Sequence, residues 1–507
     1  MKKIARTLAL ALALCLLFSA ASFAGAEEAG VLDTLRIGVA ALPGNMDPTL
    51  NVGNTTIRIQ YNVFETLLTA DPNDGSLSGM LAESWSRIDD YTVEFKLRED
   101  VLFQNGDPMT AKDVQFSFDH LKEEIDGNTL AKSLMSTIDH VDVIDDYTCR
   151  VVTAEPDPLL EQRLASSWGA WILPKDYITE VGNDAFALNP IGTGPFKVVS
   201  YSPEKIVLTR FDGYWGTTPN VKNIEYVLYA ENSSRITALS TGEVDIITQL
   251  PMDQVSIIEQ TAGLHVESMN ITNMHVVRFY IDGGDGIVNN KQFRQALSYA
   301  IDRQLLSDAF WGGKAIVPNG HQYFEFGDLY FGDFPKEEYD VEKAKALLAE
   351  SGYNGELITY ELKDGYYTYG NEAAEAIVDM WKSIGVNAQV AFKDSADGDT
   401  MVRNWSNTMR FPDPAGGLWL LWGSTEPTKT WATMPQEFID AGKVLTTSMD
   451  PEARATAART LMEIFRDEVP GILLYYPCEN WGVRDGINWV PYSNQTMDFR
   501  AENFSID

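Results

Sequence analysis

The sequence predicts an exported α/β protein, and three observations lead to that prediction. They are an N-terminal export signal, an alternation of strand-like and helix-like segments, and a length of 507 residues with 45% hydrophobic composition. A chain of that length favours two or three domains rather than one. Its apolar content is sufficient for a substantial core, which excludes a disordered protein.

Residues 1–26 are typical of a secretory signal peptide. The segment starts with cations, continues with an apolar run and ends at a small-residue cleavage site: Lys2, Lys3 and Arg6, then Leu8 to Phe18, then Ala24-Gly25-Ala26. We therefore expect a periplasmic protein whose signal is cleaved. Leu14 precedes Cys15, where a lipoprotein signal requires a small residue, so lipid anchoring is not expected. No later apolar run is long enough to cross a membrane.

The charge balance limits the possible partners. The formal net charge is −34, which argues against nucleic acid, because phosphate binding needs clustered Lys and Arg. It also disfavours an anionic membrane surface. Cys149 and Cys478 follow the signal peptide. They could pair in an oxidising compartment or remain separate buried thiols, and the sequence leaves both alternatives open.

The first predicted elements are strands. LRIGVA at 35–40 is predicted as the first strand, and residues 91–103 and 141–153 follow as strands in a region with few helical signals. We therefore predict a β-rich insertion over 73–188.

Two strand–helix–strand units are predicted further along the chain. In the first, strands at 224–229 and 243–250 flank a helix that Asn232 or Ser233 begins and Gly242 ends. In the second, strands at 356–362 and 386–392 flank a helix that Asn371 begins. Such units imply parallel strands.

Two further helices carry apolar residues at helical spacing. One is predicted over residues 290–313, where the apolar residues form a single stripe and Gly312-Gly313 ends the helix. The other lies within 339–353, with Asp340 as its cap and Gly352 as its end.

A tyrosine-rich loop is the first candidate binding site, because ligands of open α/β sheets bind beyond the carboxyl ends of strands. KDGYYTYGN follows the strand at 356–362 and carries Asp364, Tyr366, Tyr367 and Tyr369. The alternative is a tyrosine-rich surface loop or a domain contact.

The segment after the first strand supplies polar candidates. LPGNMDPTLNVGN offers Asn45, Asn51 or Asn54 as ligand contacts, although Asp47-Pro48 is more typical of a structural turn. Trp481, in YYPCENWGVRDG, is a further candidate that would border the cleft or a hinge.

The stretch NTMRFPDPAGGLWLLWG at 407–423 places a cation among large aromatic residues. Arg410 could fix a carboxylate or phosphate, and the aromatic faces could stack on a ligand. The candidate ligand residues of this region are Arg410, Trp405, Trp419 and Asp413. The alternative is that Trp419 and Trp422 belong to the core and that Arg410 pairs with Asp413.

Catalytic signatures are weak. The five histidines lack metal-ligand spacing, no G-x-S-x-G motif occurs, and GTGPF at 192–196 lacks the third glycine of a dinucleotide loop. We therefore expect no enzyme, no metal and no cofactor. A carboxylate pair for glycoside hydrolysis could still arise from the fold alone.

Taken together, the motifs resemble the family 5 extracellular solute-binding proteins of ABC importers. The resemblance rests on segments that follow the family's order: LAESWSRIDDYTVEFKLREDVLFQNGDPMTAKDVQFSF (81–118), GTGPFKVVSYSPEKIVLTRFDGYWG (192–216), ALSTGEVDI (238–246), FRQALSYAIDRQLL (293–306) and YDVEKAKALLAESGY (339–353). It implies a two-lobed periplasmic-binding-protein fold with an extra β-rich domain and a ligand cleft between the lobes. It also implies a monomer that delivers a small solute to permease subunits in the inner membrane.

The resemblance divides the chain into parts. After the signal peptide at 1–26, lobe 1 comprises 27–72, 189–285 and 486–507, the β-rich domain comprises 73–188, and lobe 2 comprises 286–485.

Two departures from the family concern the ligand. Peptide-binding members place an aspartate just before the turn that corresponds to FPDP, where it pairs with the amino terminus of the peptide; Arg410 stands there in this chain. Dipeptide-binding members also carry an arginine in the loop corresponding to 363–371, where this chain has Asp364 and no arginine. The usual peptide polarity is therefore missing or reversed. A peptide is the family default, and an anionic, opine-like or sugar-containing solute is equally compatible. The competing classes are a secreted hydrolase and a periplasmic chaperone or adhesin.

Overall fold

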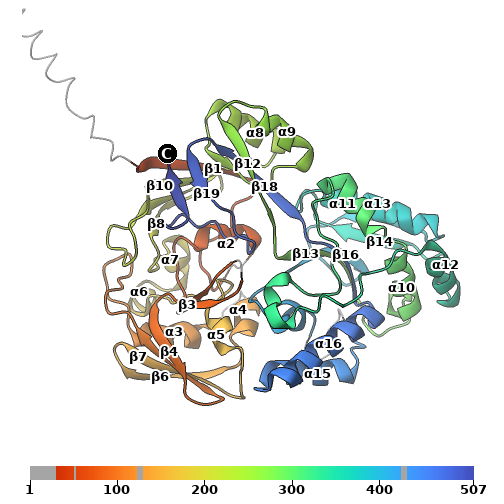
Figure 1. The fold of residues 1–507 in the computed structure, drawn as a ribbon, viewed down its shortest axis with the longest axis horizontal. Helices are drawn as coiled ribbons and strands as arrows, with labels where there is room; N and C mark the ends of the chain where they lie inside the picture. The colour runs from red at the N-terminus through yellow and green to blue at the C-terminus, as the bar shows by residue number, and fades with distance from the viewer. Residues whose placement is uncertain (1–29, 51–52, 73, 123–128, 424–430) are drawn as a thin grey trace, which may run out of the picture.

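A computed structural model describes residues 30–507 except 51–52, 73, 123–128 and 424–430. The predicted signal peptide and Asn51 therefore lie outside the described residues. Sheets of seven, five and four strands form the framework, and two small two-stranded sheets accompany them. Figure 1 shows the seven- and four-stranded sheets on the left of the molecule and the five-stranded sheet on the right. Within the described part of the chain, no helix combines the length and apolar character needed to span a bilayer.

The seven-stranded sheet has the order β12-β18-β11-β1-β10-β9-β8. Its strands are β1 (Leu32–Val39), β8 (Phe196–Tyr201), β9 (Lys205–Arg210), β10 (Val221–Leu228), β11 (Ile246–Ile247), β12 (Leu264–Asn270) and β18 (Cys478–Arg484). Helices α2 (Asn54–Gln60), α8 (Asn232–Thr241) and α9 (Met252–Glu259) accompany it. The predicted parallel unit is confirmed, with β1 inserted between β10 and β11 and parallel to both.

The five-stranded sheet has the order β15-β14-β16-β13-β17. Its strands are β13 (Asn273–Phe279), β14 (Ile358–Leu362), β15 (Ala388–Phe392), β16 (Val402–Thr408) and β17 (Gly471–Tyr475). The second predicted unit is confirmed, because β14 and β15 are parallel and α13 (Gly370–Ser383) joins them. Further helical segments are η1 (Ile287–Asn289), η2 (Phe324–Leu329), α12 (Val341–Glu350), η3 (Ala415–Trp419), α14 (Leu420–Trp422), α15 (Gln436–Thr447) and α16 (Pro451–Glu468).

The helix predicted over 290–313 is two helices. α10 (Lys291–Tyr299) ends at Ala300, and α11 (Arg303–Trp311) begins after Asp302, whose carboxylate accepts a hydrogen bond from the backbone N–H of Leu305. Asp302 therefore acts as an N-cap inside the apolar stripe. The stripe persists across the break because both helices pack on the same core, which is why periodicity alone did not reveal it.

The four-stranded antiparallel sheet falls inside the predicted insertion. Its strands are β4 (Ala82–Arg87), β5 (Thr92–Leu97), β6 (Ile138–Asp145) and β7 (Thr148–Thr153), and β2 (Leu68–Ala70) and β3 (Leu77–Gly79) form a small sheet nearby. The region is more helical than its sequence suggested, with α3 (Ala111–Lys122), α4 (Thr129–Leu134), α5 (Leu160–Leu164), α6 (Lys175–Val181) and α7 (Asn183–Leu188).

The two described cysteines are not paired. Cys149 lies in β7 of the four-stranded sheet and Cys478 in β18 of the seven-stranded sheet, and both are buried free thiols. The alternative of a disulfide between them was therefore wrong.

The chain passes between the two larger sheets at two adjacent places. β12 is followed by β13 in the other sheet, and β17 is followed by β18, so the crossings lie at 271–272 and 476–477. These crossings differ from the predicted lobe boundaries at 285/286 and 485/486. β13 was predicted in lobe 1 but belongs to the five-stranded sheet, and β18 was predicted in lobe 2 but belongs to the seven-stranded sheet. The two connections run in opposite directions, because β12 pairs antiparallel with β18 and β13 pairs antiparallel with β17.

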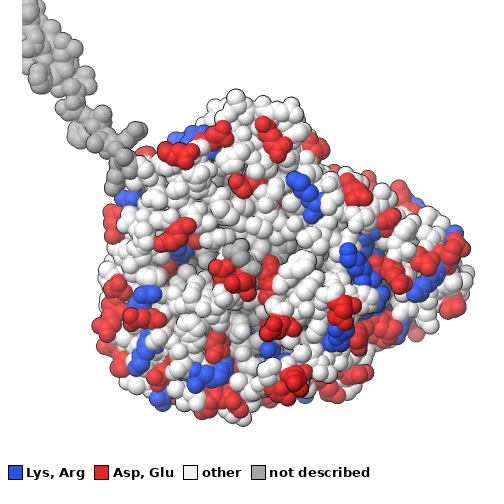
Figure 2. Space-filling view, viewed as in Figure 1, with Lys and Arg blue, Asp and Glu red and all other residues white. Residues whose placement is uncertain are grey.

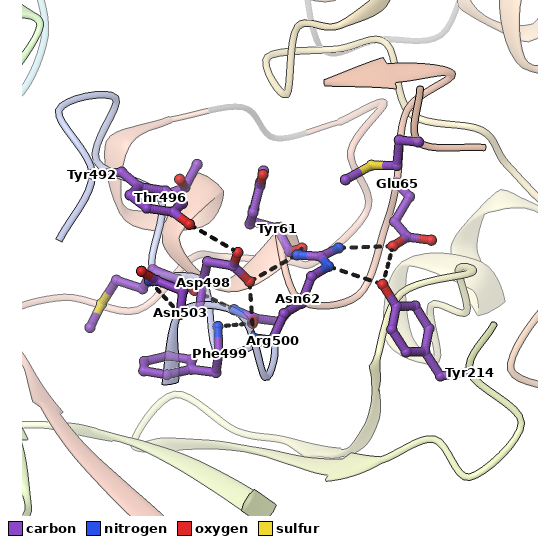
Figure 3. Close-up of polar contacts among 12 residues, drawn as sticks. Tyr61, Asn62, Glu65, Tyr214, Tyr492, Thr496, Asp498, Phe499, Arg500 and Asn503 are labelled. Atoms are coloured by element: carbon purple, nitrogen blue, oxygen red, sulfur yellow. Dashed lines mark hydrogen bonds and ion pairs between the residues drawn. The ribbon is translucent and has the colours of Figure 1, made fainter. Parts of the chain in front are cut away.

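The C-terminal segment returns to the first lobe and is anchored there. β19 (Ile487–Trp489) pairs with β20 (Phe504–Ile506). Between them, the Arg500 guanidinium contacts the carboxylates of Glu65 at 2.9 Å and Asp498 at 3.0 Å, and Tyr214 completes the cluster (Figure 3).

Candidate ligand-binding cleft

A cleft of about 1030 Å³ lies between the two larger sheets. Its walls come from both sides of the two crossings: the end of β1, helix α2 and the N-termini of α8 and α9 on one side, and β13 with residues 363–372 on the other. Strand β18 contributes residues 478–480. The first strand ends at the cleft as predicted, because Val39 and Ala40 line it.

The tyrosine-rich loop lines the cleft. Asp364, Tyr366, Tyr367 and Tyr369 all contribute to the wall, and their role as a binding rim stays a prediction. The Tyr367 hydroxyl donates to Oγ of Ser406 at 2.9 Å, and the ring packs on His275 with centroids 4.8 Å apart. Burial lowers the pKa of His275 to about 4, so this part of the wall is aromatic and uncharged at neutral pH.

Tyr369 also joins the two sides of the cleft. Its hydroxyl donates to Oδ1 of Asp253 in α9 at 2.8 Å, and it accepts from the Asp253 backbone N–H at 3.3 Å. Burial raises the pKa of Tyr369 to about 12, so the phenol remains a donor at neutral pH. A further contact between the two sides runs from Thr408 to Asn54, with 3.5 Å between their side-chain oxygens.

A buried ion pair in the cleft wall was missed by the sequence analysis. The Arg58 guanidinium binds the Glu479 carboxylate through two contacts of 2.8 Å, and both side chains line the cleft. Arg58 lies one helical turn after the candidate Asn54, and Glu479 lies two residues before the candidate Trp481. Residues four positions apart share one face of a helix, so the candidate Asn54 could have pointed to Arg58 as a second cleft residue.

Arg410 lies in a separate, smaller cavity of about 60 Å³. Its guanidinium stacks on the ring of Trp168 at 3.9 Å. The predicted alternative, a pair between Arg410 and Asp413, is wrong. Asp413 contacts Arg454 at 2.5 Å and accepts from the Ala415 backbone N–H at 2.8 Å, which makes it a structural residue of the turn rather than a cleft residue.

The structure does not place the three candidate tryptophans along the cleft. On β16, Ser406 faces Tyr367, so the alternating neighbour Trp405 faces the other way and packs on Arg278 at 4.1 Å. Trp419 packs on Phe438 of α15. Trp481 is 2% exposed and packs edge-on against Trp489. The interpretation of Trp419 and Trp422 as core residues therefore fits their positions.

Of the candidate asparagines Asn45 and Asn54, one lines the cleft and the other does not. Asn54 lines the cleft. Asn45 accepts a hydrogen bond from the Asp47 backbone N–H at 3.1 Å, which places it in the structural turn around Asp47-Pro48 rather than along the cleft. Among the described residues, no group of three or more His, Cys, Asp and Glu side chains is arranged to hold a metal ion.

Comparisons with known proteins agree with this architecture. The model of the bacterial extracellular solute-binding proteins, family 5 Middle, matches residues 76–429. A probable D,D-dipeptide-binding periplasmic protein, DdpA, of Escherichia coli K12 is 27% identical over 341 residues. That alignment spans 64% of this chain and 64% of the relative, which is slightly less than two thirds of its length. A dipeptide-binding protein of the same organism is 25% identical over 433 residues, 78% of this chain and 80% of the relative.

Solved structures share the fold. The periplasmic binding protein DppA from Helicobacter pylori, in complex with the peptide STSA, superposes with a TM-score of 0.83 at 22% identity, over 94% of this chain and 98% of the other. The binding protein AgaA from A. tumefaciens R10, in complex with agropinic acid, gives a TM-score of 0.82 at 22% identity, over 94% and 99% of the chains.

Proposed function

Because the chain belongs to the bacterial extracellular solute-binding proteins, family 5, we propose that it captures a small solute between its two lobes and delivers it to the permease of an ABC importer. The proposed location is the periplasm, reached through the signal peptide predicted at residues 1–26. The first relative is named a periplasmic protein, which supports this location. The family's role in solute binding does not favour the alternative of a secreted hydrolase.

The observation that carries the proposal is the cleft of about 1030 Å³, whose walls come from both lobes. Sites for small molecules are typically about 300–1,000 Å³ in volume, with apolar and aromatic walls and a few fixed polar groups. This cleft has Tyr366, Tyr367 and Trp311 as aromatic groups, and Arg58 with Glu479 as a fixed charged pair. Its volume supports a ligand larger than one amino acid.

Closure of the lobes is the proposed capture step. The hinge consists of the two crossings at 271–272 and 476–477. The bond between Tyr369 and Asp253 spans the cleft, so it can form only while the lobes are close together. Such hinge closure around a ligand is an established type of domain movement.

The proposal is tested by native mass spectrometry on the exported protein, purified without denaturation. We expect a small-molecule adduct that is released intact on denaturation and that raises the melting temperature when it is added back. Conversion of the released compound to a product by the protein would instead indicate an enzyme. Protection of an unfolded client protein without any small-molecule adduct would indicate a chaperone.

A further inference from the structure

We propose that the ligand carries a carboxylate group, and that Arg410 binds this carboxylate in the 60 Å³ cavity beside the main cleft. This inference rests on the proposed function, and it names the chemical class of one end of the solute. The cavity lies where three parts of the chain meet: Trp168 from the β-rich insertion, Thr69 from β2, and Arg410 with Phe411 from the segment after β16.

The position of Arg410 is fixed by its backbone rather than by its side chain. The Arg410 carbonyl accepts a hydrogen bond from Oγ of Ser166 at 2.6 Å, and its backbone N–H donates to the Gly416 carbonyl at 3.1 Å. Trp168, which is 2% exposed, supports the face of the guanidinium at 3.9 Å. The planar group is therefore held in place while its edge remains available.

Two nitrogen donors at the edge of the Arg410 guanidinium have no hydrogen-bond acceptor among the described residues. Nε and Nη1 of Arg410 are both buried, and neither has a hydrogen-bond acceptor among the described residues. The described groups that act on the pKa of Arg410 through their charge are Tyr323, Tyr367 and Tyr366, and none of them is a carboxylate. A buried donor without an acceptor is costly, and a buried unpaired cation is more costly still. A ligand carboxylate would supply acceptors in the geometry that a guanidinium prefers.

Size and charge favour a single carboxylate over a phosphate. A cavity of about 60 Å³ holds a few water-sized groups, which suits a carboxylate with the carbon that bears it. Asp71 and Glu325 also line the cavity, and burial raises the pKa of Glu325. Because these acidic groups repel a dianion more strongly than a monoanion, a phosphate is disfavoured.

The cavity is also within electrostatic reach of the main cleft. Burial lowers the pKa of Arg410 to about 10, whereas Tyr323, Tyr367 and Tyr366 act on it in the opposite direction. Tyr366 and Tyr367 line the cleft, so a solute bound there could extend its acidic end to Arg410.

The test uses the full exported protein and the variant Arg410→Gln. The probes are the compound released from the wild-type protein and the same compound with its carboxylates converted to methyl esters. We expect Arg410→Gln to weaken binding of the acid about thirtyfold or more. The ester should bind wild type and variant with similar affinity, because the two changes remove the same interaction. An equal loss for acid and ester, or a released compound that contains no carboxylate, would overturn the inference while leaving the carrier function intact.

Two further variants separate binding from folding. Arg410→Lys retains the charge but not the planar fork, so it should bind the acid with intermediate affinity. Arg459→Gln removes an exposed arginine that pairs with Asp333, and it should bind like wild type. Ligand-free Arg410→Gln should melt close to wild type, because the loss of the stacking on Trp168 is offset by removal of a buried cation whose Nε and Nη1 have no acceptor among the described residues. A clear decrease in that melting temperature would show a structural role for Arg410 and would contradict the inference.

A measurement with acetate decides the question if no compound is released. Sodium acetate should raise the melting temperature of wild type more than sodium chloride does at equal ionic strength. Arg410→Gln should respond equally to the two salts. Equal responses of the wild type to both salts would count against a carboxylate site at Arg410, whereas the absence of a released compound bears on the carrier function alone.

Discussion

The side chain of His321 is held in one protonation state by its neighbours. Nε2 lies 2.7 Å from Oδ1 of Asn407, and the indole N–H of Trp422 donates to the same oxygen. Since an amide oxygen only accepts, Nε2 of His321 carries the proton. Nδ1 is buried and has no partner among the described residues, so a second proton there would be unsatisfied. Burial accordingly lowers the pKa of His321 to about 4.

We predict that the contribution of His321 to stability is lost as the pH falls from about 6.5 to about 4. In this range the unfolded chain binds a proton at His321 and the folded chain does not, so the free energy of unfolding decreases with decreasing pH. One such histidine contributes a slope of at most about 1.4 kcal/mol per pH unit. His275 has a pKa of about 4 for the same reason and adds to the effect.

Urea denaturation at pH 7, 6 and 5 measures this slope. His321→Gln keeps a donor for Asn407 but cannot be protonated, so its slope should be smaller than that of wild type. An unchanged slope in His321→Gln would assign the acid sensitivity to other groups.

At the scale of single elements, α15 packs unusually closely on Trp419. Gly442 lies in the middle of α15, and a Cβ atom at this position would come within 2.0 Å of the Trp419 ring. Glycine is a poor helix former, so its presence there is explained by this approach rather than by helix propensity. The contact holds the partly buried Trp419 against the core and explains why this candidate does not reach the cleft.

We predict that Gly442→Ala destabilises the protein. In an exposed helix this change would stabilise by about 1 kcal/mol, but here the methyl group must displace a packed indole, which typically costs about 1–3 kcal/mol. Chemical denaturation measures the difference. Lys443→Ala, at the exposed neighbouring position, is the control and should change stability by less than about 0.5 kcal/mol. A stabilising effect of Gly442→Ala would show that Trp419 moves freely.

The local sequence pattern was sufficient to predict most helices and strands and one part of the cleft wall. The parallel units around β10 and β14 were predicted from periodicity and helix caps, and loop 363–371 was predicted because it follows a strand. The break at Asp302 was not visible, since the apolar stripe continues across it. Trp405 lies on the face of β16 that the pairing of β16 with β13 and β14 determines. The local sequence pattern does not contain that register, so it could not predict the face. The pair between Arg58 and Glu479 joins residues 421 positions apart, and no local pattern contains such a contact.

At the scale of the whole molecule, buried charges join the C-terminal segment to the segment that follows α2. Glu65 is fully buried and receives hydrogen bonds from Arg500 and Tyr214 (Figure 3). The indole N–H of Trp215 also donates to Glu65. Outside this cluster, acidic groups are scattered over the viewed face rather than gathered in one patch (Figure 2). The acidic surface favours solubility, and the viewed face carries no single acidic patch, while the buried pair ties the C-terminal segment to the first lobe.

We predict that Arg500→Met destabilises the protein by about 3 kcal/mol or more, because it leaves the Glu65 carboxylate buried without its cation. Chemical denaturation again provides the measurement. Lys382→Met breaks an exposed pair with Asp379 and should cost less than about 0.5 kcal/mol. The double variant Glu65→Gln/Arg500→Met should recover part of the loss, since no buried charge of the pair remains. Equal costs for the buried and exposed pairs would contradict this account.

Lobe closure would depend on the proposed hinge and on the hydrogen bond between Tyr369 and Asp253. Tyr369→Phe removes both hydrogen bonds between its hydroxyl and Asp253, which join the two lobes, so it should weaken ligand binding by about 1 kcal/mol, or about fivefold. Small-angle X-ray scattering should give a larger radius of gyration for the ligand-free protein than for the liganded one. At a subsaturating ligand concentration, the variant should have a larger mean radius than wild type. Tyr339→Phe is the control, because that tyrosine is 52% exposed and lies outside the cleft. A radius of gyration that does not change with ligand would mean that the hinge stays closed, and capture would then require a route other than lobe opening.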